Sequence, residues 1–250
     1  MSVYEKSKPL INKTKGILSW IIRHNILIII FLFITFPILK YFSLPSKNEI
    51  RNLRKINPKN TALMRQREKD YFEKRKKVSF QHYWVPLSQI NENLKRAVIV
   101  AEDGDFYQHE EIGWYKVKQS IRKDIQKGKF VRGASTITER VAKNLFLSTL
   151  KNPIRKLKEI LIAWMLEDEL TKSRIHEIYL IIIELGQGIF GVGAALQNYF
   201  GKNASELTHE DAACLASVIA NPLRHNPNKN TQYLHYRKKV ILERVEVRGC

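Results

Sequence analysis

Residues Ile90–His109 read INENLKRAVIVAEDGDFYQH, and this stretch indicates both the class of fold and the position of a candidate site. Its apolar residues have the i, i+4, i+7, i+8 spacing of one helical face. They are Ile90, Leu94, Ala97, Val98 and Ala101. We therefore expect a helix that follows a cap at Ser88 and ends at Gly104.

An acidic turn follows this helix and contains Glu102, Asp103 and Asp105. Glu102 stands at the end of a buried helix, where desolvation and the negative end of the helix dipole both disfavour a carboxylate. Its pKa should rise toward that of a useful general base. His109 could orient or neutralise a neighbouring carboxylate. The alternative is an acidic turn that only ends the helix, and this stretch alone favours that alternative.

The rest of the folded part also has helical patterning. We expect helices at about 114–128, after the capping-box pair Thr136 and Glu139, from Asn152-Pro153 to about Leu170, from Ser173 to Glu184, from Thr208 to before Asn221-Pro222, and over 231–247. In the helix after Asn152, the apolar face is Ile154, Leu157, Leu161, Trp164 and Met165. Together these patterns predict a mainly α fold.

Gly186–Gly191 reads GQGIFG and matches the G-x-G-x-x-G pattern of dinucleotide-binding sites. That pattern needs a strand before it and a βαβ context. The surrounding sequence predicts helix after helix with no hairpin-type alternation, so we interpret the glycines as a tight loop between two helices.

The 250-residue chain has 43 Lys and Arg against 24 Asp and Glu, a formal charge of +19. This charge favours a polyanionic partner, which could be nucleic acid, an anionic membrane surface or a phosphorylated substrate. Cys214 and Cys250 are too few for a disulfide framework or a metal site, and Cys214 is expected to pack in a helix.

The run Ile26–Leu39 is uncharged and reaches about 20 residues with its flanks. We interpret 25–44 as a transmembrane signal anchor; a buried helix or a cleaved signal peptide is the alternative. The predicted organisation is a basic cytoplasmic segment 1–24, the anchor, a basic juxtamembrane connector 45–79 and a folded domain 80–248. A long C-terminal domain is translocated largely regardless of charge, so we expect it outside.

Two further clusters could bind an anion. Gly133, Ser135 and Thr136 lead into a helix N-terminus, and Lys143 follows one to two turns later. In NPIRKLKE, Arg155 and Glu159 share a helix face near Lys151, Lys156 and Lys158. Ordinary capping and a surface salt bridge would explain each cluster taken singly.

Four motifs occur in order: ED-x-x-F-x-x-H from Glu102, GASTIT…AKNLFLS from Gly133, RK-x-x-E from Arg155 and K-x-R-I-x-E-x-Y-L from Lys172. Together they strongly resemble the peptidoglycan glycosyltransferases of glycosyltransferase family 51. NPKNTALMRQR upstream looks like the monofunctional, membrane-anchored branch of these biosynthetic transglycosylases, and the likeness covers about Asn57 to Leu242.

The resemblance implies a lysozyme-like glycosyltransferase domain behind one N-terminal transmembrane helix. It implies a bacterial enzyme that polymerises lipid II into β-1,4-linked glycan strands, with inversion and release of undecaprenyl diphosphate. Glu102 would be the general base and Glu159 the second essential glutamate. The implied substrate-binding residues are Asp103, Phe106, His109, Ser135, Thr136, Lys143, Lys151, Arg155, Glu177 and Arg237.

The same resemblance implies that the partners are lipid II, the nascent glycan strand, anionic lipids and proteins of cell-wall synthesis or division. Nucleic acid is not among them. The implied location is the bacterial cytoplasmic (inner) membrane, crossed once, with the catalytic domain on the periplasmic side. No cofactor is required, although a divalent cation, Mg²⁺ or Mn²⁺, could assist at the diphosphate.

The chain departs from the family pattern at Glu139-Arg140, where Gln-Gln is usual, at Ile181, where Asn is usual, and at Glu111, where Gly is usual. Arg140 could add a contact to the diphosphate or block the donor groove. One alternative is therefore a lipid II- or glycan-binding scaffold without turnover. Another is a lysozyme-like hydrolase, since paired carboxylates also suit glycosidic hydrolysis.

Overall fold

The structure is a computed structural model, and it describes residues 25–26, 31, 35, 44–108, 135–149 and 152–248. The chain divides into two compact units, Met1–Pro45 and Ser46–Cys250. Most of the predicted anchor and the helix predicted at 114–128 lie outside the described residues, as do His109 and Lys151. Within the described ranges, no helix combines the length and the apolar character that a membrane crossing requires.

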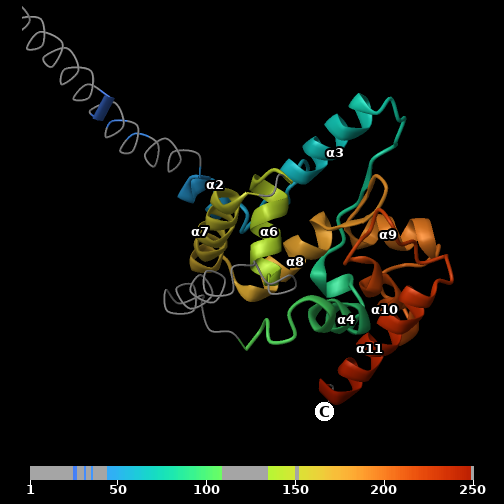
Figure 1. The fold of residues 1–250 in the computed structure, drawn as a ribbon. Coiled ribbons are helices and arrows are strands. Elements are labelled where there is room, and N and C mark those ends of the chain that lie inside the picture. The colour runs from blue at the N-terminus through green and yellow to red at the C-terminus, as the bar shows by residue number, and fades with distance from the viewer. Residues whose placement is uncertain are drawn as a thin grey trace, which may run out of the picture. The chain divides into compact units, whose positions relative to one another are not determined.

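The unit Ser46–Cys250 is mainly helical, as the sequence predicts (Figure 1). Its helices are α2 (Lys47–Asn52), α3 (Ala62–Glu73), the 3₁₀ turn η1 (Leu87–Gln89), α4 (Glu92–Glu102), α6 (Ile137–Phe146), α7 (Pro153–Glu169), α8 (Lys172–Ile182), α9 (Gly191–Tyr199), α10 (His209–Val218) and α11 (Gln232–Arg248). Its strands are β1 (Gln81–His82), β2 (Glu184–Gly186) and β3 (Ile189–Phe190).

Three of the predicted helix starts are confirmed by capping hydrogen bonds. The side chains of Thr136, Asn152 and Thr208 accept from the backbone N–H groups at the starts of α6, α7 and α10. Two predicted starts are wrong by a few residues. Ser88 lies in η1 and Asn91 caps α4, whereas Thr171, two residues before Ser173, caps α8.

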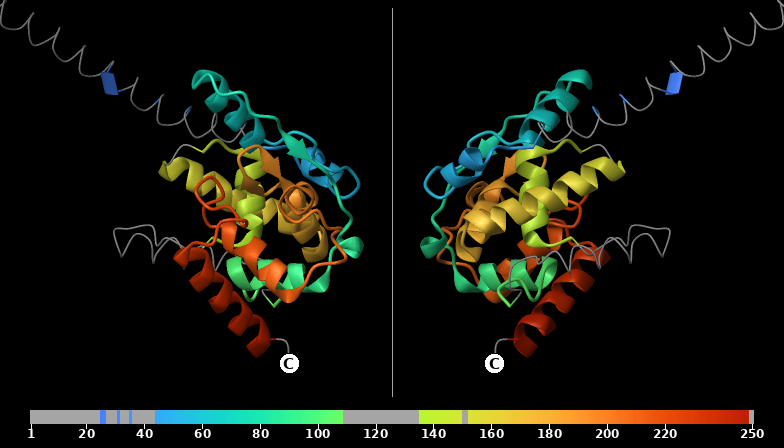
Figure 2. Two further views of the ribbon diagram at one scale, coloured as in Figure 1. Left: turned by 90° about the vertical axis from the view of Figure 1, so that its right-hand side faces the viewer. Right: turned by 90° about the vertical axis from the view of Figure 1, so that its left-hand side faces the viewer.

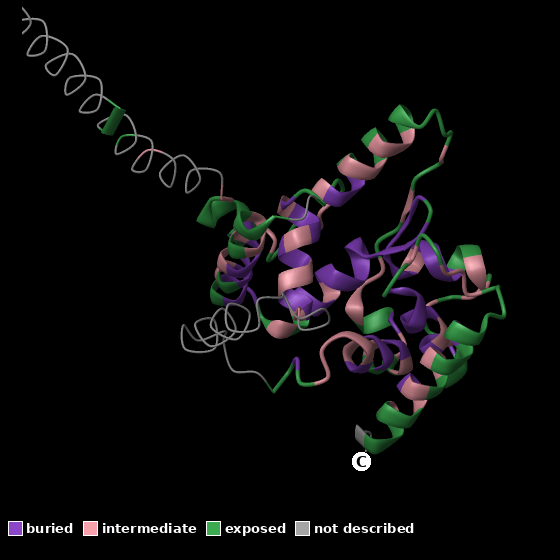
Figure 3. Ribbon diagram, viewed as in Figure 1, coloured by how far each residue is buried: buried purple, intermediate pink, exposed green. Residues whose placement is uncertain are grey.

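Helix α8 forms the centre of the core. All residues from Ile178 to Ile182 are at most 1% exposed, and α6, α7 and α9 pack around the helix (Figure 3). On another side of the unit, α4 packs against α10 and α11, with α11 drawn in red along the lower edge of the fold (Figure 2). Cys214 lies in α10, as expected. The C-terminal end of α4 and the start of α6 lie in one region, because the backbone N–H of Ile137 donates to Asp103.

A small sheet replaces the loop predicted between two helices. Its order is β1-β3-β2, with β2 antiparallel and β1 parallel to β3. Gly188 in the hairpin and Gly191 after it have φ values of +75° and +77°, which favour glycine. A Cβ atom on Gly191 would stand 2.3 Å from the carbonyl oxygen of Ile181. Periodicity missed the strands because they are two and three residues long.

The folded unit begins earlier than the sequence predicts. Residues 45–79 were expected to form a basic connector, but α2 and α3 belong to the compact unit that starts at Ser46. Leu63 and Met64 are buried with Phe190, and Thr61 is fully buried. The basic residues of this segment are therefore partly used inside the fold, as Arg67 illustrates by pairing with Glu184.

Helix α7 turns its apolar stripe outward. Ile154, Leu157 and Trp164 are 41%, 50% and 38% exposed. The inward face instead combines Ile162 and Leu166 with three buried carboxylates, Glu159, Glu167 and Glu169. Each of these carboxylates has a cation partner within the fold, so burial of this face leaves no lone charge.

Candidate active site

Glu102 is the last residue of α4, and its side chain is 2% exposed. Its Oε2 lies 2.6 Å from Nε of Arg140 on α6. The angles between these two atoms do not satisfy a hydrogen bond, so the contact is an ion pair without a directional bond. The hydroxyl of the fully buried Tyr179 on α8 donates toward the same carboxylate.

Burial raises the pKa of Glu102, the direction that the sequence predicts. The positive charges of Arg140, Arg237 and Lys143 oppose this shift, and the negative charge of Asp103 adds to it. The environment therefore combines a carboxylate of raised proton affinity with three cations that limit the rise of its pKa. A carboxylate of raised proton affinity is suited to act as a general base.

Glu159, the second predicted glutamate, is buried nearly two turns into α7. Its two oxygens are held by neighbours on the same helix: Nη1 of Arg155 at 2.5 Å and Nζ of Lys156 at 2.8 Å. Lys156 also reaches Oε2 of Glu139 at 2.8 Å and Oγ of Ser135 at 3.1 Å. Lys156 thus ties the start of α6 to α7.

The acidic turn and α6 are directly joined. Oδ2 of Asp103 accepts from the backbone N–H of Ile137 at 3.2 Å, and Thr136 caps the same helix end by accepting from the N–H of Glu139. Lys143 stands two turns further on. Burial and the nearby charges of Arg140 and Arg155 lower its pKa.

Glu102, Arg140, Lys143, Arg155 and Glu159 form a charged cluster, and a cavity of about 290 Å³ adjoins it. Its charged lining is mainly cationic and consists of Arg67, Arg140, Lys143, Arg155 and Glu184. Glu102 and Glu159 are not part of the lining, but each contacts a residue that is. The cavity lining can therefore contact an anionic group through its cations, and one of these, Arg140, also contacts Glu102.

The remaining predicted residues are more scattered. Arg237 of α11 acts electrostatically on Glu102, which places it with the cluster. Phe106 is 1% exposed and packs edge-on against His176 in the core. Glu177 accepts from the backbone N–H of Leu87 and binds Arg174, so it connects α8 to η1.

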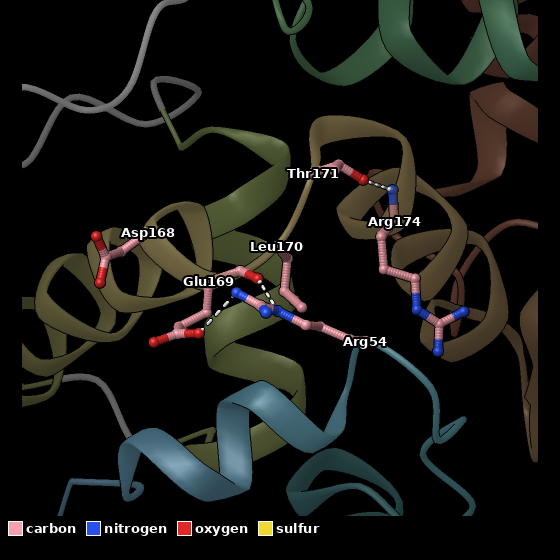
Figure 4. Close-up of a pocket in the computed structure, with 6 residues that line it drawn as sticks. All are labelled: Arg54, Asp168, Glu169, Leu170, Thr171 and Arg174. Carbon is pink, nitrogen blue, oxygen red and sulfur yellow. Dashed lines mark hydrogen bonds and ion pairs between the residues drawn. The ribbon is translucent and has the colours of Figure 1, made fainter.

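A second pocket, of about 550 Å³, shares no lining residue with the first. In Figure 4, Arg54 and Glu169 point toward each other, joined by dashed lines, and Arg174 lies beyond Thr171. Its arginines are paired, Arg54 with Glu169 and Arg174 with Glu177. The hydrogen bond from Arg51 lowers the pKa of Glu169, the reverse of the shift at Glu102.

Three contributors to the cluster were not among the predicted site residues: Arg140, Lys156 and Tyr179. Arg140 stood out only as a departure from the family pattern, and Lys156 and Tyr179 lie inside the RK-x-x-E and K-x-R-I-x-E-x-Y-L motifs. Among the described residues, no group of three or more His, Cys, Asp or Glu side chains could hold a metal ion.

A buried carboxylate beside a cation-lined cavity suits an enzyme that uses an acid–base group on an anionic substrate. Residues 68–246 match the family model described as Transglycosylase. The chain is 43% identical over 189 residues to the biosynthetic peptidoglycan transglycosylase of Herminiimonas arsenicoxydans, covering 76% of this chain and 82% of the relative. It is 39% identical over 247 residues to the protein of the same name from Nitrosomonas europaea, covering 98% of each. The chain belongs to the transglycosylase family, which confirms the family that its motifs indicate.

Proposed function

We propose that the chain is a peptidoglycan glycosyltransferase that polymerises lipid II into β-1,4-linked glycan strands, with inversion and release of undecaprenyl diphosphate. The observation that carries the proposal is the buried Glu102, whose pKa is raised, next to the cavity lined by Arg140, Lys143 and Arg155. The names of the relatives support the same activity.

In this mechanism the 4-hydroxyl of the acceptor gives its proton to Glu102. Its oxygen attacks the anomeric carbon of the donor from the face opposite the leaving group. The bond from that carbon to the diphosphate oxygen breaks, and its electron pair leaves with the diphosphate. No covalent enzyme intermediate forms, so one base and a cationic environment for the leaving group suffice.

Arg155 and Lys143 stabilise the negative charge that grows on the departing diphosphate. Glu159 acts by holding Arg155 and Lys156 in fixed positions, since its two oxygens bind both side chains. Ser135, Thr136 and Asp103 keep the start of α6 in register with the base. Lys151, His109, Phe106, Glu177 and Arg237 complete the proposed set of substrate-binding and supporting residues.

We further propose that residues 25–44 anchor the enzyme once in the bacterial cytoplasmic membrane, with the folded unit on the outer side. The apolar run Ile26–Leu39 and the charge of +19 support this placement. The exposed stripe of α7, which includes Trp164, also suits a membrane surface, because tryptophan favours the interface between apolar and wet environments. Its partners there are lipid II, the growing glycan and anionic lipids.

One observation favours a second candidate, a lipid II-binding scaffold. Arg140 contacts Glu102, and the Glu102 side chain is only 2% exposed. An acceptor hydroxyl therefore cannot reach the base in this arrangement. A hydrolase is favoured less, because a lysozyme-like reaction has no diphosphate for the cationic cavity to bind.

The deciding experiment is a gel assay of lipid II polymerisation by the purified full chain. We expect polymer from the wild type and a rate lower by about 10²–10⁴ for Glu102→Gln. Glu92→Gln, at the exposed start of the same helix, serves as the matched control and should keep the wild-type rate. Saturable lipid II binding without polymer would establish the scaffold, and digestion of purified sacculi would establish the hydrolase.

A further inference from the structure

Arg140 is shared between two parts of the site. Its Nε lies 2.6 Å from Oε2 of Glu102, and the same side chain lines the cationic cavity. The other carboxylates near it are already neutralised. Glu159 is held by Arg155 and Lys156, and Glu139 is held by Lys156. The carboxylate that Arg140 neutralises is therefore Glu102.

This pair has the properties of a contact that can be exchanged. Its atoms are close but poorly aligned, so it lacks the directional bond of a forked arginine–carboxylate pair. A diphosphate in the cavity would offer oxygens to which a guanidinium can bind bidentately, and such charge-assisted pairs are among the strongest polar contacts in proteins. The arginine already borders that cavity, so the two binding partners compete for the same side chain.

The pair also creates a conflict for the reaction. A general base must be reached by the hydroxyl that it deprotonates, and its proton affinity must be high at that moment. In the structure the Glu102 side chain is 2% exposed and one of its oxygens contacts the cation Arg140. Both conditions improve if Arg140 leaves.

Resting on the function proposed above, we propose that Arg140 is a positioning residue that the substrate switches: it neutralises Glu102 in the empty site and moves to the donor diphosphate when the donor binds. The base is then uncovered and strengthened only when a leaving group is in place. In the empty site, the buried carboxylate is kept paired.

Several other groups also influence the pKa of Glu102 and must be considered in a pH test. They are Lys143 of α6, Arg237 of α11, Asp103 directly after α4, and Tyr179 of α8. Helix α10 also packs on α4, and its buried residues are apolar apart from Ser217. Arg140 differs from these groups because it contacts Glu102 as an ion pair and also borders the cavity, so its charge is the one that the diphosphate would withdraw from Glu102.

The sign of the effect follows from the state of the base. Arg140 lowers the pKa of Glu102 in the free enzyme and no longer does so in the donor complex. The acidic limb of kcat/KM, which reports the free enzyme, should therefore lie at lower pH than the acidic limb of kcat, which reports the complex. The negative charge of the diphosphate itself also raises the pKa of Glu102, and it does so in every variant. A comparison between variants therefore measures the effect of Arg140 alone.

The test compares wild type, Arg140→Gln and Arg140→Lys in lipid II polymerisation as a function of pH. In Arg140→Gln the kcat/KM limb should move up by about 1–3 pH units, the usual effect of an adjacent opposite charge, while the kcat limb stays. Arg140→Lys should restore part of the separation. Arg96→Gln makes the same change at an exposed position of α4 and should leave both limbs in place.

A second readout does not need turnover. The ¹³C carboxyl signal of Glu102, assigned with Glu102→Gln, is titrated with and without inorganic diphosphate. Diphosphate should raise the pKa of Glu102 more in the wild type than in Arg140→Gln, and Arg140→Gln should bind diphosphate at least about 10-fold more weakly. Equal shifts and equal affinities in the two proteins would overturn the role of Arg140. Absence of polymer at every pH, with the titration as expected, would instead refute the proposed function alone.

Discussion

Arg67 of α3 binds Glu184 of β2, which lies 117 positions away in the sequence. Nε and Nη2 of the arginine donate hydrogen bonds of 2.7–3.0 Å to the two carboxylate oxygens. Glu184 is 5% exposed in its side chain, so removal of the arginine leaves a buried charge without its partner. We expect Arg67→Met to lower the free energy of unfolding by about 3–5 kcal/mol. Urea unfolding of the detergent-solubilised full chain measures it.

The control for this change lies on the same helix. Lys69 is 70% exposed in its side chain and approaches Glu73 at 3.8 Å. Lys69→Met should cost less than about 0.5 kcal/mol. Equal losses for the two variants would show that α3 is not held by Glu184.

Thr136 and Thr208 allow a comparison of two equivalent helix caps. Each accepts from the N–H of the third helical residue, one at α6 beside Lys143 and one at α10. Replacement of either by Ala should destabilise the protein by about 1 kcal/mol. Polymerisation at a temperature where both variants are folded should fall for Thr136→Ala and stay near wild type for Thr208→Ala. A parallel fall in both would make Thr136 a cap without a role in the site.

Lys156 should matter as much as the residues that the motifs single out. Its Nζ contacts Glu159, Glu139 and Ser135 within 3.1 Å. Lys156→Met removes one cation from the buried Glu159 and the cation that contacts the partly buried Glu139. We expect a loss of polymerisation rate of about 10². Lys239→Met, at an exposed position of α11, is the control. Retention of the wild-type rate by Lys156→Met would limit the lysine to a structural role.

His176 gives the stability a pH dependence of its own. Burial lowers its pKa from 6.5 to about 4, and Nδ1 pairs with the hydroxyl of Tyr107 at 3.0 Å. Between these two pH values the unfolded chain binds the proton and the folded chain does not, so stability falls as the pH drops from 6.5 to 4. The loss should approach about 3 kcal/mol.

The measurement is urea unfolding at a series of pH values for wild type and His176→Phe. Carboxylates contribute below pH 5 in both proteins, so the difference between the two curves isolates the histidine. The wild type should lose more stability across this window than the variant. Parallel curves would mean that His176 is protonated in the folded state.

Local patterns predicted most helices because caps and periodicity act within a few residues. Thr136, Asn152 and Thr208 each begin a helix where their side chains can reach the next turn. The patterns did not predict the direction in which α7 faces. Its apolar stripe suggested an inward face, whereas the carboxylates Glu159 and Glu169 are inside. Glu159 is paired by Lys156 of the same helix, and Glu169 by Arg54 from a distant segment.

The site was predicted where a motif coincides with a helix end. The pKa of Glu102 is raised by burial, as its place at the end of α4 indicates. Its partner Arg140 could not be assigned from sequence, since 38 positions separate the two residues and only the packing of α6 against α8 and the acidic turn brings them together. Long-range pairs of this kind depend on tertiary contacts that periodicity does not encode.

Helix α7 carries Glu159 on its buried side and Leu157 and Trp164 on its outer side. A helix is a stiff rod with a fixed radius, so the separation between its two sides is constant. If the outer side of α7 rests on a surface, the helix therefore keeps Glu159 at a fixed distance from that surface. The helix works as a spacer, and its diameter determines how far the chemistry takes place from that surface.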